Sequence, residues 1–104
     1  MANGYVGILT VDLHFPESTS LKGKRKFVKS AKAQLRERFG ASVAEVDGQD
    51  TWQRATLAAA LTSGSLKELA RASDHVEGWL LGRFPDGVRV ERVLTSFEDA
   101  GGIG

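Results

Sequence analysis

Between residues 20 and 39, basic side chains recur at a spacing suited to binding a polyanion. The segment SLKGKRKFVKSAKAQLRERF holds eight Lys or Arg and one Glu, a charge of 8 − 1 = +7, whereas the remainder, with 6 bases and 12 acids, sums to −6. On a helix, six of the bases fall within an arc of roughly 120°. These are Lys22, Arg25, Lys26, Lys29, Lys32 and Arg36. RNA phosphates would match this arc, and so would an acidic protein surface or plain solvent.

Concentrating like charges on one helix has a cost. Bases three or four residues apart repel by roughly 0.2–0.5 kcal/mol per pair, so about six such pairs cost on the order of 1–3 kcal/mol. Phosphates, neighbouring acids or salt would offset this repulsion. No aromatic residue lies among these bases on the helical wheel, so base stacking by the arc itself is not supported.

A second group of polar residues surrounds a Trp in the stretch VAEVDGQDTWQRATLAAA. Asp50, Trp52, Gln53 and Arg54 would form a recognition surface if the Trp stacks on a base while Arg and Gln donate to phosphate or base. Two simpler interpretations stay open. Glu45 and Arg54 would pair across a hairpin, and Trp52 would cap the end of the sheet.

Catalytic chemistry has less support in the sequence. Asp12 and His14 stand two apart on a predicted strand, where a carboxylate can orient an imidazole, but no nucleophile or third ligand lies at a useful spacing. There is no Cys, and no P-loop or zinc-ligand pattern is present. We expect no enzymatic activity, cofactor or metal. An enzyme that uses Asp12, His14 or the Asp50–Arg54 turn is the least favoured hypothesis.

The elements that position these residues follow from periodicity. Apolar and polar residues alternate over 5–15, 52–63 and 88–97, and 42–46 is a short β-branched run, so these four segments are predicted strands. Helical periodicity predicts one helix that is capped by Ser20 and stopped by Gly40, and a second that starts at the SLKE capping box (65–68) and breaks at Pro85. The last strand alternates less cleanly, which indicates a bulge.

This order predicts an α+β ferredoxin-like βαββαβ sandwich, a four-stranded antiparallel sheet with two helices on one face. We expect a single domain over 1–98 and a flexible tail over 99–104. The open sheet face would show a small apolar patch that lacks aromatic residues. Such a patch suits self-association better than base stacking. Its members are Val6, Ile8, Ala58 and Ala60.

The stretch from Ser20 to Ser65 resembles the central signature of the YlxP-like proteins, a small bacterial family of unknown function. The matching elements are Ser-Leu-Lys-x-Lys-Arg, Val-x-Glu-Val and Gln-Asp-x-Trp-Gln-Arg. They comprise Ser20, Leu21, Lys22, Lys24, Arg25, Glu45, Gln49, Asp50, Trp52, Gln53 and Arg54. The family usually has Glu in place of Gly23, which would complete a capping box with Ser20.

The resemblance implies a ferredoxin-like fold. It also implies an RNA or ribosome setting, because genes of the family commonly lie beside translation and ribosome-maturation factors. No activity is established for the family, so the resemblance implies no catalytic residues.

Together these observations predict a cytoplasmic, non-enzymatic accessory protein that associates with RNA or a ribosomal particle through its basic helix. The alternative is a homodimeric interaction or scaffold module, assembled through the open sheet face. The absence of Cys fits a reducing cytoplasm. No signal-peptide pattern appears, and the apolar runs are far shorter than the ~20 residues of a membrane span, so no membrane partner is expected.

Overall fold

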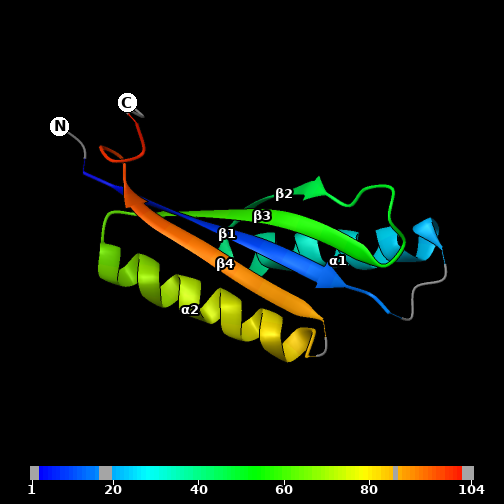
Figure 1. The fold of residues 1–104 in the computed structure, drawn as a ribbon. Helices are drawn as coiled ribbons and strands as arrows, with labels where there is room; N and C mark the ends of the chain where they lie inside the picture. The colour runs from blue at the N-terminus through cyan, green and yellow to red at the C-terminus, as the bar shows by residue number, and fades with distance from the viewer. Residues whose placement is uncertain (1–2, 17–19, 86, 102–104) are drawn as a thin grey trace.

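The fold is a four-stranded antiparallel sheet packed against two helices (Figure 1). The structure is a computed structural model that describes residues 3–16, 20–85 and 87–101. The strands lie in the order β2-β3-β1-β4. In chain order the elements are β1 (Tyr5–His14), α1 (Leu21–Phe39), β2 (Ser42–Asp47), β3 (Arg54–Ser63), α2 (Leu66–Arg83) and β4 (Val88–Ser96). The predicted α+β ferredoxin-like class is confirmed.

The two faces of the sheet differ because side chains alternate along each strand. On β1, the odd-numbered residues Leu9, Val11 and Leu13 are buried and join one core cluster with residues of both helices. Residues Ala55 to Leu61 of β3 repeat this pattern. The even-numbered residues of these strands therefore lie on the face that neither helix covers. We call this face the open sheet face.

The predicted helix ends are confirmed. Ser20 is the N-cap of α1, and its Oγ accepts a hydrogen bond from the Gly23 backbone N–H at 3.0 Å, although Gly23 offers no reciprocal carboxylate. Gly40 ends α1 with φ of 65°, a left-handed conformation that favours glycine. Ser65 caps α2 by accepting from the Glu68 N–H at 3.3 Å.

The predicted bulge in the last strand is wrong. β4 pairs with β1 without a register shift, and the irregularity lies in β2 between Glu45 and Asp47. β4 alternates weakly because Arg92, on its helix-facing side, reaches past the core to an ion pair with Asp74 of α2 at 2.6 Å.

The start of β3 differs from the prediction. β3 begins at Arg54, two residues later than predicted, so Trp52 and Gln53 belong to the β2–β3 loop. Of the predicted tail, residues 102–104 lie outside the described residues. The domain boundary at residue 98 stays a prediction. Among the helices that the structure describes, none is long and apolar enough to cross a membrane.

Candidate functional site

The basic residues of α1 fall into classes with different surroundings, and Lys24 stands apart from the rest. Its side chain is only 1% exposed. Its Nζ donates to the carbonyl oxygens of Gly48 at 2.6 Å, Arg54 at 3.3 Å and Gln49 at 3.4 Å. The same Nζ lies 3.6 Å from Oε2 of Glu45. Lys24 is therefore a structural residue whose ammonium group binds partners within the protein.

These contacts fix the position of the β2–β3 loop. Because the carbonyls that Lys24 binds lie at both ends of this loop, the loop is held against the first turns of α1 (Figure 1). The loop also carries Asp50 and Trp52, which are exposed. The basic helix and the predicted recognition turn, far apart in the sequence, thus share one end of the molecule.

Two bases near the end of α1 also have partners within the protein. Arg36 Nη2 donates to the carbonyl oxygen of Val43 in β2 at 2.9 Å. The Arg38 guanidinium lies 5.7 Å from the ring centroid of Trp79, within cation–π range. Arg36, predicted to bind phosphate, is therefore tied to β2 in this structure.

The other five bases have no such partner. Four of them are exposed and Lys32 is half-buried. Within residues 3–16, 20–85 and 87–101, none of the five forms an ion pair or a side-chain hydrogen bond. Their mutual repulsion is thus not offset by acids of the described chain. We call this set the free basic face, and its members are Lys22, Arg25, Lys26, Lys29 and Lys32.

Two aromatic side chains lie at the same end of the molecule and are half-exposed. Trp52 is 54% exposed and is not part of the core cluster. Phe27 of α1 is 49% exposed and stacks on Phe15, with ring centroids 5.6 Å apart. Helical periodicity placed Phe27 on the apolar side, and nothing in the sequence signalled its exposure at the edge of that side.

Gln53, predicted as an interaction residue, is held by the segment that follows β1. Its carbonyl oxygen accepts from the Phe15 N–H at 2.7 Å, and its Nε2 donates to the Pro16 carbonyl oxygen at 3.3 Å. It therefore ties the loop to the segment after β1, whereas the exposed Asp50 and Trp52 form no side-chain hydrogen bond among the described residues.

The predicted pair between Glu45 and Arg54 is wrong. Glu45 is opposite Leu57, which is buried on the helix side of the sheet, and Glu45 pairs with Lys24 instead. Arg54 is opposite His14 at the end of β1, on the open sheet face. The structure therefore separates Arg54 from the free basic face by the thickness of the sheet.

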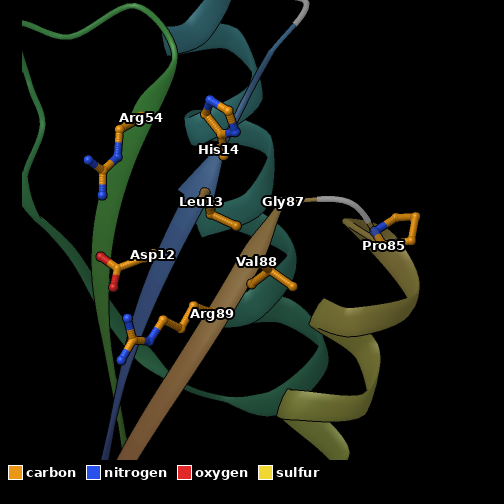
Figure 2. A pocket seen from close by; sticks show the side chains of 8 residues that line it. All are labelled: Asp12, Leu13, His14, Arg54, Pro85, Gly87, Val88 and Arg89. Carbon is orange, nitrogen blue, oxygen red and sulfur yellow. The ribbon is translucent and has the colours of Figure 1, made fainter.

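On the open sheet face, Arg54 lines a pocket of about 610 Å³ together with Asp12, His14 and Arg89 (Figure 2). The Asp12 carboxylate accepts a hydrogen bond from Thr56 Oγ1 at 2.7 Å. Among the residues that the structure describes, no three His, Cys, Asp or Glu side chains gather as a metal site would require. The pocket is therefore a mixed-charge surface with two guanidinium groups.

Comparisons with known proteins agree with this architecture. Residues 6–94 match the model of a family described as a protein of unknown function, DUF503. The chain belongs to this family. It is also 30% identical over 97 residues to the uncharacterized protein YlxP of Bacillus subtilis (strain 168), which covers 89% of this chain and 97% of that protein. The resemblance to the YlxP-like family is confirmed.

A likeness to a solved structure supports the fold alone. The de novo designed protein Foldit4 superposes with a TM-score of 0.55 over 88% of this chain and 96% of its own, at 12% identity. The comparisons therefore show the family and the fold of this chain.

Proposed function

We propose that the protein is a non-enzymatic cytoplasmic accessory protein that binds RNA, alone or in a ribosomal particle, through the free basic face and the adjoining β2–β3 loop. One observation carries the proposal. Five basic side chains line the outer side of α1 without an acidic partner in the described ranges, although the sequence as a whole has a net charge of only +1.

Phosphates would supply the negative charges that the free basic face lacks. Each phosphate that a Lys or Arg neutralises releases a counterion, which drives binding and makes it depend on salt. The rise along a helix is about 1.5 Å per residue, so the span from Lys22 to Lys32 covers about 15 Å of α1. A helix face of this length can follow several phosphates of one strand or of one groove edge.

An exposed aromatic residue in the β2–β3 loop is suited to binding an RNA base. Trp52 is 54% exposed, and Lys24 holds this loop against the first turns of α1. Unpaired bases stack on exposed rings of this kind. The geometry therefore supports single-stranded or looped RNA as the ligand.

Co-sedimentation of the purified protein with ribosomal particles and with a structured RNA tests the proposal directly. We expect binding at low salt that falls steeply as salt rises, and loss of the complex after nuclease treatment. A protein that remains in the supernatant with both ligands at low salt would contradict the proposal.

Replacing Trp52 by Ala should weaken RNA binding by about 1–3 kcal/mol, because one base loses its stacking partner. Since the side chain is 54% exposed, the melting temperature should change little. Fluorescence anisotropy with a labelled RNA measures the effect. The matched control is Trp52→Phe, which keeps a ring and should retain most of the affinity. Equal affinities of wild type and Trp52→Ala would rule out stacking by this residue.

A second candidate function, homodimerisation, is favoured by one feature of the open sheet face. Ile8 and Val93 lie opposite one another in register and are 44% and 63% exposed. Ala60 is opposite Ile8 on the other side. A second copy of the chain would cover this apolar patch, which consists of Val6, Ile8, Ala58, Ala60 and Val93.

The Ala58→Asp substitution tests this candidate, since a carboxylate buried between two sheets would oppose association. We expect light scattering to report a dimer for the wild type at micromolar concentration and a monomer for the variant. Leu81→Asp, at an exposed position of α2, is the control and should leave the mass unchanged. A monomeric wild type would remove this candidate.

A further inference from the structure

One corner of the open sheet face brings together basic side chains from three adjacent strands. His14 on β1 is opposite Arg54 on β3, and Asp12 on β1 is opposite Arg89 on β4. Paired residues lie about 5 Å apart across the strands, and residues i and i+2 lie roughly 7 Å apart along a strand. We propose that this corner, the His14–Arg54–Arg89 corner, binds the phosphate group of a small phosphorylated molecule.

The positions of the two guanidinium groups support the proposal. Figure 2 shows the Asp12 carboxylate between the guanidinium groups of Arg54 and Arg89, with the ring of His14 across from Arg54 at the end of β1. Asp12 is held in place because its Oδ1 accepts the hydrogen bond from Thr56. One carboxylate thus lies between two cations among the side chains that line the pocket.

The two arginines can turn toward a ligand. Within the described ranges, Arg54 has no ion pair and no side-chain hydrogen bond. Arg89 pairs with Glu91 at 3.1 Å, but both side chains are mostly exposed. Exposed pairs of this kind are weak, whereas a guanidinium binds phosphate through two parallel hydrogen bonds. Because the pair with Glu91 is weak, Arg89 can leave it at little cost to bind a phosphate.

Gly87, directly before β4, lines one side of the His14–Arg54–Arg89 corner. The His14 N–H donates to the Gly87 carbonyl oxygen at 2.7 Å. A Cβ atom at position 87 would come within 2.5 Å of the His14 carbonyl oxygen, so only Gly permits this close approach. The resulting pocket of about 610 Å³ is within the size range of small-molecule sites. It is open to solvent on one side, so the remainder of a phosphorylated molecule can extend out of it.

This site differs from the free basic face, because α1 and its bases lie on the other side of the sheet, whereas Arg54 and Arg89 lie on the open sheet face. The proposal therefore does not depend on RNA binding. The ligand chemistry has two sources, free inorganic phosphate and a phosphate ester, and a titration can distinguish them.

The test is an amide-resolved NMR titration of the full chain at constant ionic strength with inorganic phosphate, ribose 5-phosphate and AMP. Shifts are expected at the amides of Asp12, His14, Arg54 and Arg89, with saturation in the millimolar range or below. If an ester saturates at lower concentration than inorganic phosphate, the pocket also binds the organic part. If all three saturate alike, the site binds the phosphate group alone. Both outcomes support the proposal.

Two variants at Arg54 keep the test decisive. Arg54→Ala should weaken phosphate binding about tenfold or more, because a charge-assisted hydrogen-bonding partner is lost. Arg54→Lys, which keeps the charge but not the fork, should fall between wild type and Arg54→Ala. The exposed Arg71 of α2 supplies the matched control, and Arg71→Ala should bind as wild type does. Absence of shifts at these amides, or equal affinity of Arg54→Ala and wild type, would overturn the proposal.

Discussion

Replacing Lys24 by Ala should lower the free energy of unfolding by about 3–5 kcal/mol, because removal of one member of a buried ion pair leaves the other uncompensated. Lys24 is almost fully buried, and its Nζ donates to three carbonyl oxygens and forms an ion pair with Glu45. Oε2 of Glu45 is itself buried and has no hydrogen-bond partner among the described residues. Urea unfolding followed by circular dichroism measures the loss.

Lys26 provides the matched control, since it is exposed on the same helix. Lys26→Ala should change stability by no more than about 0.5 kcal/mol. A double-mutant cycle of Lys24→Met with Glu45→Gln then isolates the ion pair, and we expect a coupling energy of about 1–3 kcal/mol. Equal effects of Lys24→Ala and Lys26→Ala would contradict the structural role of Lys24.

Reversing the charge of Lys22, Lys26 and Lys29 together should weaken RNA binding about 100-fold or more at moderate salt, because three phosphate contacts are lost. The substitutions are Lys22→Glu, Lys26→Glu and Lys29→Glu, and they change the net charge by −6. All three side chains are exposed, so the fold should persist. Filter binding or anisotropy with the same RNA measures the affinity.

A control triple variant separates the local surface from net charge. Lys67→Glu, Arg71→Glu and Arg83→Glu make the same change in net charge at exposed positions of α2. This variant should lose much less affinity than the α1 variant. If both variants weaken binding equally, the interaction is with overall charge and not with the free basic face.

The fold could be predicted from the sequence because most helices and strands have a local signal in periodicity or in capping residues. Alternation over residues 5–15 and 52–63, a helical apolar stripe in both helices, and capping residues at Ser20, Gly40 and Ser65 all agree with one another. Such agreement between local preference and global pattern is typical of sequences that specify one fold.

The candidate sites were harder to predict because they depend on contacts between distant segments. The helical wheel placed Lys24 at the edge of the apolar face, but its carbonyl partners lie 24 to 30 residues further along the chain. A bulge in β2 leaves Glu45 on the helix side, so a simple hairpin register assigns it the wrong partner. Arg89 enters the His14–Arg54–Arg89 corner only through the β1–β4 register, which no local pattern reveals.

The central claim is that the five residues of the free basic face contact phosphates, and the salt dependence of RNA binding tests it most directly. The logarithm of the association constant should fall with the logarithm of salt concentration at a slope of about −3.5, which corresponds to five contacts on a single strand. In the Lys22/Lys26/Lys29→Glu variant the slope should be smaller in magnitude by about 2. A wild-type slope near zero, or an unchanged slope in the variant, would contradict the claim.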